Sequence, residues 1–207
     1  MGRWIEVDSR TKVIMCLIPT VIVVVTLARF PRARQGFGPA PFPMELAEKL
    51  SVDQLVDRAG DAGTLMLPTW MPGGIKLREI YFKGLAILVY SDKDVRDYRK
   101  GNVTIQITRT DSSPTYEQLQ QRSQRPSRDV VMVRDFPIVI LEDAVPDSDM
   151  KKHGIWPMMT YFWYDGFYYI ITVNKEETTR EDVLNIVENM KPVGPGTLRK
   201  PTDTAAG

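Results

Sequence analysis

The sequence predicts an α+β fold: an antiparallel sheet of about seven strands with helices packed at its ends, behind one N-terminal transmembrane helix. Three observations carry this prediction. Seven short apolar runs are separated by turn residues, helix-capping signals lie before and after these runs, and one uncharged apolar stretch lies near the N-terminus. Strands that follow one another, with the helices segregated from them, are typical of α+β domains.

The N-terminal stretch, residues 13–28, carries no charged side chain. As a helix it would be about 24 Å long, at about 1.5 Å per residue, against a hydrocarbon core of about 30 Å. Arginine and lysine side chains on both flanks can extend to the headgroups and make up for much of the difference. We therefore predict a short tail over residues 1–12 and a transmembrane signal anchor over residues 13–30.

Two other interpretations of this stretch stay open. It could be a cleaved signal peptide, for which Ala28 offers a weak site, or a buried helix of a soluble protein. Three cations precede the stretch and three follow it closely, so the positive-inside rule does not decide its orientation. Because the segment is N-terminal and resembles an export signal, we expect a single-pass protein of the cell membrane with its domain outside the cytoplasm.

The segments on either side of the soluble domain have a composition of their own. Residues 31–43 hold four prolines and two glycines, which favour an extended spacer that lifts the domain off the bilayer. Residues 192–207 are rich in Pro, Gly and Thr and have no apolar periodicity, which is typical of a disordered tail. The soluble domain itself is predicted over residues 44–191.

The soluble domain opens with helical patterns. Residues 44–50 predict a first helix. A capping box that starts at Ser51 opens a second helix, which directs Leu55 and Val56 inward and ends at Gly60.

After the Pro-Gly-Gly sequence at residues 72–74 the pattern changes to strands. Ser113 and Pro114 predict the start of a short helix that runs through residue 119 and interrupts them. The first five strands are predicted at residues 75–83, 85–91, 103–109, 130–134 and 137–142.

The last two strands form a predicted hairpin. Residues 158–164 and 167–173 flank Asp165-Gly166, and an Asp-Gly pair between apolar runs favours a type I′ turn. A capping box that starts at Thr178 then opens the closing helix. Its expected apolar face holds Val183, Leu184, Val187 and Met190.

This hairpin is unusually aromatic. Folding it about residues 165–166 sets Phe162 opposite Tyr169 and Trp163 opposite Tyr168, so aromatic side chains lie on both of its faces. Either helices cover one face and a loop or second sheet covers the other, or one face is a platform for an apolar ligand, a glycan or a protein. The candidate ligand or partner surface consists of Tyr161, Trp163, Tyr168 and Tyr169.

Catalytic and metal-binding signals are scarce. His153 is the only histidine and lies in a polar stretch, and Cys16 is the only cysteine and lies in the N-terminal run, so the soluble domain can form neither a multi-histidine site nor a thiolate site. The sequence contains no phosphate-binding loop or dinucleotide fingerprint. Its net charge of +1 lacks the basic excess that nucleic-acid binding needs. We expect no catalytic residue, no metal, no cofactor and no nucleic-acid partner.

Charged clusters in predicted loops have a simpler interpretation. Neither acidic run has the spacing of an EF-hand, and the basic loop has no aromatic residues between its arginines, so we interpret all three as solvated charge. Contact with lipid headgroups is the alternative for the basic loop. Asn102 begins a glycosylation sequon, which has a meaning only in an exported protein. The acidic residues are Asp92, Asp94 and Asp97, then Glu142, Asp143, Asp147 and Asp149; the basic loop holds Arg122, Arg125 and Arg128.

Residues 67–77 read Leu-Pro-Thr-Trp-Met-Pro-Gly-Gly-Ile-Lys-Leu. This segment resembles the Leu-Pro-x3-Pro-x-Gly motif of an uncharacterised extracytoplasmic domain family of bacterial and archaeal single-span membrane proteins, from which Ile75 departs where the family usually has an aromatic residue. The hairpin at residues 163–169 and the helix at residues 179–190 are similar to the same family. The resemblance implies a fold like that of lipoprotein-carrier and sigma-regulator sensor domains, and it implies no catalytic residue.

Together these patterns lead us to expect a membrane-anchored, non-enzymatic, extracytoplasmic binding or sensing domain. Its expected partners are the lipid bilayer, through the N-terminal helix, and a protein or an apolar ligand at the aromatic hairpin. A structural or assembly subunit of an envelope protein complex is the alternative, because the same aromatic residues could form a protein interface. A hydrolase based on two carboxylates ranks third.

Overall fold

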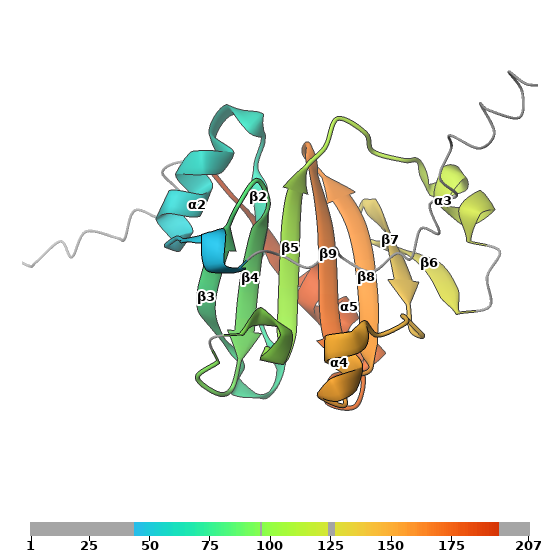
Figure 1. The fold of residues 1–207 in the computed structure, drawn as a ribbon. Helices are drawn as coiled ribbons and strands as arrows, with labels where there is room; N and C mark the ends of the chain where they lie inside the picture. The colour runs from blue at the N-terminus through green and yellow to red at the C-terminus, as the bar shows by residue number, and fades with distance from the viewer. Residues whose placement is uncertain (1–43, 96, 124–126, 195–207) are drawn as a thin grey trace, which may run out of the picture. The chain divides into compact units, whose positions relative to one another are not determined.

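The computed structural model describes residues 44–95, 97–123 and 127–194 (Figure 1). An eight-stranded antiparallel sheet has the order β1-β3-β4-β5-β9-β8-β7-β6, and a two-stranded sheet joins β10 to β2. The large sheet consists of β1 (Glu48–Lys49), β3 (Lys76–Phe82), β4 (Ala86–Ser91), β5 (Val103–Arg109), β6 (Arg128–Val133), β7 (Phe136–Leu141), β8 (Pro157–Tyr164) and β9 (Phe167–Asn174), and the small one of β2 (Leu65–Pro68) and β10 (Met190–Val193).

Short helices connect these strands. The α-helices are α2 (Val52–Ala59), α3 (Tyr116–Arg122), α4 (Ser148–Lys152) and α5 (Arg180–Glu188), and the 3-10 turns are η1 (Met44–Leu46), η2 (Gly60–Ala62), η3 (Pro72–Gly74) and η4 (Tyr98–Lys100). The α+β class and the antiparallel sheet are therefore confirmed, with eight strands instead of about seven.

The predicted anchor at residues 13–30 and the spacer at residues 31–43 lie outside the described residues. Within the described ranges, no helix has both the length and the apolar character to cross a bilayer. At the other end, β10 continues through Val193, beyond the predicted domain boundary at residue 191.

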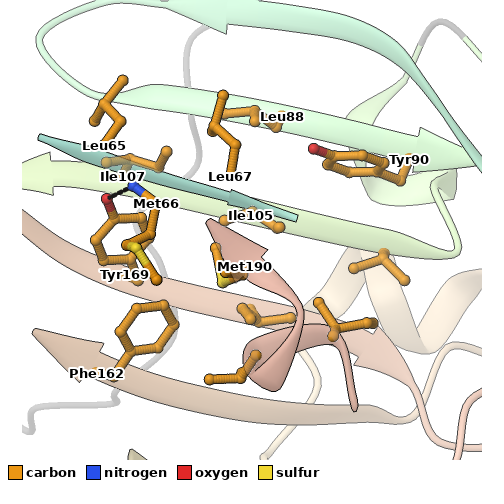
Figure 2. Close-up of a cluster of buried hydrophobic side chains, with 14 of the residues drawn as sticks. Leu65, Met66, Leu67, Leu88, Tyr90, Ile105, Ile107, Phe162, Tyr169 and Met190 are labelled. Atoms are coloured by element: carbon orange, nitrogen blue, oxygen red, sulfur yellow. Dashed lines mark hydrogen bonds between the residues drawn. The ribbon is translucent and has the colours of Figure 1, made fainter. Parts of the chain in front are cut away.

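The large sheet buries its two faces differently. We call the face that carries Leu88, Ile105 and Ile171 the core face. Its side chains form one continuous hydrophobic cluster with residues of α2, α5 and the small sheet, which cover it. On the outer face, the side of Ile87 and Tyr161, two smaller clusters are separate from each other. Figure 2 shows β2 crossing over the core face. The core therefore lies between the large sheet and a layer formed by two helices and the small sheet.

The aromatic hairpin folds as predicted. Asp165 and Gly166 have φ angles of 44° and 80°, as a type I′ turn requires. Phe162 lies opposite Tyr169, and Trp163 lies opposite Tyr168.

Three helix predictions need correction. Residues 44–50 form η1 and β1 instead of a helix, because Glu48 and Lys49 pair with the edge of β3. The N-cap of α3 is Thr115 instead of Ser113. The Thr115 hydroxyl accepts from the Gln118 N–H, and the Thr115 N–H donates to the Gln118 side-chain oxygen.

The closing helix α5 starts one residue later than predicted, at a capping box formed by Thr179 and Asp182, while the Thr178 side chain is buried. Its buried face consists of Val183, Ile186 and Val187. Met190 is buried as well, but it belongs to β10.

The hairpin turn is attached to the connection between η2 and β2. The Thr64 N–H donates to the Asp165 carboxylate, and a Cβ atom added to Gly63 would lie 2.1 Å from the Asp165 carbonyl oxygen. Gly63 also has a φ of 141°, which favours glycine. The chain can therefore approach the turn this closely only without a side chain at residue 63.

We expect Gly63→Ala to destabilise the protein strongly, because the backbone at Asp165 would have to move. The matched control is Gly84→Ala. Gly84 also has a positive φ, of 72°, but no atom lies within 4 Å of a Cβ atom added there. The control should cost only the penalty of a left-handed residue, about 1–2 kcal/mol. Urea unfolding of the full chain measures both, and equal costs would contradict this role of Gly63.

Candidate functional site

A groove of about 420 Å³ opens beside the small sheet. Most of its lining comes from residues 67–77, the segment that carries the family resemblance, so we call it the motif groove. The rest comes from one side chain each of α2, β4 and β10. Its lining residues are Val52, Leu67, Pro68, Thr69, Trp70, Met71, Ile75, Lys76, Leu77, Tyr90 and Val193.

The sequence builds the groove by ending β2 and turning the chain back into β3. Pro68 ends β2, and the Thr69 N–H and hydroxyl both donate to the Asn189 carbonyl oxygen, at 3.1 and 2.7 Å. Gly73 and Gly74 then adopt positive φ angles, which permit the tight turn of η3. Trp70 projects between these two points and is 39% exposed. The motif thus presents an indole ring on a backbone that is held at both ends.

Two hydrogen-bond donors face this apolar surface. Tyr90 is only 5% exposed, and within the described residues its hydroxyl has no hydrogen-bond partner. Burial raises the pKa of Tyr90 well above its usual range, so the hydroxyl stays protonated at neutral pH and can donate. Lys76 is exposed and forms no ion pair with another described residue. No carboxylate lines the groove, so it suits a ligand that is largely apolar and carries an acceptor oxygen.

The position of β2 depends on the aromatic hairpin. The Met66 N–H donates to the Tyr169 hydroxyl at 2.8 Å, in the buried layer between β2 and β9 (Figure 2). The Tyr169 ring stacks on Phe162 with 4.5 Å between ring centroids, and both side chains are fully buried. Burial raises the pKa of Tyr169, so its hydroxyl remains available as a neutral group. Tyr169 therefore belongs to the core and not to an exposed surface.

The other face of the hairpin is partly covered. Tyr161 is 9% exposed and packs in the cluster that contains Leu119 of α3, while its hydroxyl donates to the Met159 sulfur at 3.6 Å. Trp163 and Tyr168 are half-buried and stack with 4.8 Å between ring centroids. Of the four residues proposed from the sequence, Tyr161 and Tyr169 are buried, and Trp163 and Tyr168 have intermediate exposure.

The other polar residues noted in the sequence have local roles. His153 is exposed in the turn after α4, and no cluster of three or more His, Cys, Asp and Glu side chains in the described ranges could hold a metal ion. Asp97 caps η4, and Glu142 pairs with Arg180. The Asn102 amide nitrogen donates to Glu177, so the atom that would carry a glycan is already engaged.

Sequence reasoning did not select Tyr90 or Lys76. Tyr90 alternates with Ala86 and Leu88 on the same side of β4, and this pattern indicated an ordinary core position. The one local signal of a role in binding was the phenol of Tyr90 at the end of an otherwise aliphatic row. A hydroxyl in a buried position normally has a hydrogen-bond partner. The groove itself brings together β2, β4 and β10, which are far apart in the sequence.

No protein-family model matches the chain, and no curated protein sequence matches it either. The motif groove must therefore be interpreted from its own chemistry. That chemistry is an apolar surface with an exposed indole ring, a buried phenol and one lysine, built on a strand that the hairpin holds in place.

We expect Tyr169→Phe to cost about 1–3 kcal/mol of unfolding free energy, because the buried Met66 N–H would lose its acceptor. The control is Tyr116→Phe, whose hydroxyl accepts an exposed hydrogen bond from Gln120 and should change stability little. Urea unfolding and amide exchange at Met66 measure the effect. Unchanged protection of the Met66 amide in Tyr169→Phe would contradict the proposed anchoring of β2.

Proposed function

We propose that this chain is a membrane-anchored, non-enzymatic binding or sensing domain, which holds a largely apolar small molecule in the motif groove. The observation that carries the proposal is Tyr90, a largely buried side chain in the lining of the groove, whose hydroxyl has no hydrogen-bond partner among the described residues. In a lining that is otherwise mostly apolar, this hydroxyl is a donor that an acceptor oxygen on a ligand would satisfy.

The size and lining of the groove support the proposal. A volume of about 420 Å³ falls within the range of small-molecule sites, which are mostly apolar with a few convergent polar groups. Trp70, Met71 and Leu77 supply the apolar contacts, and Tyr90 and Lys76 supply two hydrogen-bond donors. Its lining side chains include no histidine, cysteine or carboxylate group, which favours binding over catalysis.

The family resemblance and the groove involve the same residues. Residues 67–77 carry the resemblance to the extracytoplasmic domains of single-span membrane proteins, and most of the groove is lined by this segment. We propose that the chain shares their arrangement, with residues 13–30 as the anchor in the cell membrane and the domain outside the cytoplasm.

A second observation favours the alternative role, an assembly subunit of an envelope complex. On the outer face, Met132 lies opposite Pro137, and Trp163 lies opposite Tyr168, on strands β6, β7, β8 and β9. Met132 is 51% exposed and the two aromatic residues are half-buried. A row of Met, Pro, Trp and Tyr side chains has the composition of a protein interface core.

Site-specific photo-crosslinking separates the two roles. We expect a benzophenone amino acid in place of Trp70, in the full chain in native membranes, to capture a molecule of a few hundred daltons upon irradiation. The matched control is the same substitution at Trp156, which is 47% exposed and does not line the groove. Mass spectrometry of the intact protein reads the adduct, and Tyr90→Phe should lower its yield at residue 70.

A small-molecule adduct of equal yield at residue 156, or none at residue 70, would contradict the binding role. The assembly role has its own readout at residue 132. If it holds, a benzophenone at Met132 should give adducts of protein size with one defined partner, and groove variants such as Tyr90→Phe should not change them.

The anchor is tested by alkaline carbonate extraction of membranes. We expect the full chain to remain with the bilayer, because an apolar helix of residues 13–28 would be held by the hydrocarbon core. A variant that lacks these residues should be released and serves as the control. Release of the full-length chain, or of a shortened form of it, would contradict a retained anchor.

A further inference from the structure

A second cavity, of about 190 Å³, lies at the other end of β2 from the motif groove. Leu65, the first residue of β2, lines it, whereas Leu67 and Pro68 line the groove. We call it the arginine cavity, because Arg58 and Arg109 are the charged residues among the described residues that line it.

The walls of the arginine cavity are part of the hydrophobic core. Leu55 of α2, Ile107 of β5 and Phe167 of β9 line it, and each of them is less than 7% exposed. Such walls make favourable contacts with apolar groups, and an engineered apolar protein cavity of about 150 Å³ is large enough to accept benzene. The space therefore suits an apolar group of about six carbon atoms.

Positive charge lies at the mouth of the cavity. Arg58 and Arg109 are both exposed. The Arg58 guanidinium lies 4.8 Å from the centroid of the Phe82 ring and pairs with Glu48 at 2.6 Å. Arg109, at the end of β5, forms no ion pair or hydrogen bond through its side chain with any described residue. Since Glu48 offsets the charge of Arg58, the mouth carries about one uncompensated positive charge.

We propose that the arginine cavity binds a small apolar monocarboxylate, with a tail of about six carbon atoms in the cavity and its carboxylate on Arg109. The single uncompensated charge favours a monoanion over a phosphate dianion, and the planar guanidinium matches a carboxylate in a bidentate pair. This site is separate from the motif groove, so the two proposals can fail independently.

The test is calorimetric titration of hexanoate into the full chain in lipid nanodiscs, with the heat of empty nanodiscs subtracted. We expect one site with a dissociation constant on the order of 1 mM or below, given the small number of ligand atoms. Hexan-1-ol and hexylammonium carry the same tail without the negative charge, and each should bind at least about tenfold more weakly.

Variants separate the two parts of the site. Arg109→Gln should weaken hexanoate binding about tenfold, whereas Lys83→Gln removes a nearby exposed cation that does not line the cavity and should change it little. Ala59→Leu keeps both arginines but fills the cavity, and it should abolish hexanoate binding. Circular dichroism and urea unfolding identify any variant that fails to fold.

Equal binding of hexanoate and hexan-1-ol would overturn the proposal, and so would full binding by a folded Ala59→Leu variant or no binding by the wild-type chain. Tyr90→Phe tests independence from the motif groove, because it should leave hexanoate binding unchanged. If Tyr90→Phe abolishes hexanoate binding while Arg109→Gln leaves it unchanged, the carboxylate is bound in the groove and the arginine cavity is not the site.

Discussion

The hydrogen bond from the Met66 amide to the Tyr169 hydroxyl joins two parts of the chain that no strand ladder connects. Within the described residues, β2 pairs with β10 alone, and the pair lies across the large sheet instead of within it (Figure 2). A two-stranded sheet is marginal by itself, so its position depends on what lies beneath it. Tyr169 supplies an acceptor at the centre of that layer, and the contact of Gly63 with Asp165 fixes the chain just before β2. Through these two contacts, the aromatic hairpin determines the position of β2.

Both recesses of the domain follow from this arrangement. The arginine cavity includes Leu65 at the start of β2, and the motif groove includes Pro68 at its end. Each has apolar walls and side-chain donors, and neither is lined by a carboxylate. A shift of β2 would therefore change both recesses at once, which offers a physical route for coupling between ligands at the two sites. The sheet beneath them is rigid by comparison, since its central strands are bonded on both sides.

Local signals were sufficient where the periodicity was strong and bounded by turn residues. The strand at residues 103–109 alternates cleanly, and Asp165-Gly166 determines the hairpin register by its turn geometry. They failed for β2 and β10, because Leu-Met-Leu-Pro and Met-Lys-Pro-Val are short, contain proline and become strands only by pairing with each other. The same limit applies to the site. The alternation of side chains showed that both faces of the hairpin are aromatic. It could not show that β2 covers Tyr169 while Trp163 and Tyr168 remain half-buried, because this coverage depends on contacts between distant segments.

The small sheet also has a bearing on solubility. The two outer edges of such a sheet normally present unpaired backbone N–H and C=O groups, which can pair with a strand of another molecule. Along β2, the Met66 N–H is taken by Tyr169, and Pro68 has no N–H. Along β10, Pro192 lies opposite Met66 and likewise has no N–H, and the Met190 carbonyl oxygen accepts from the Arg134 guanidinium at 2.9 Å. Edge-to-edge pairing through this small sheet is therefore disfavoured, so strands of neighbouring molecules do not readily add to it beside the two recesses.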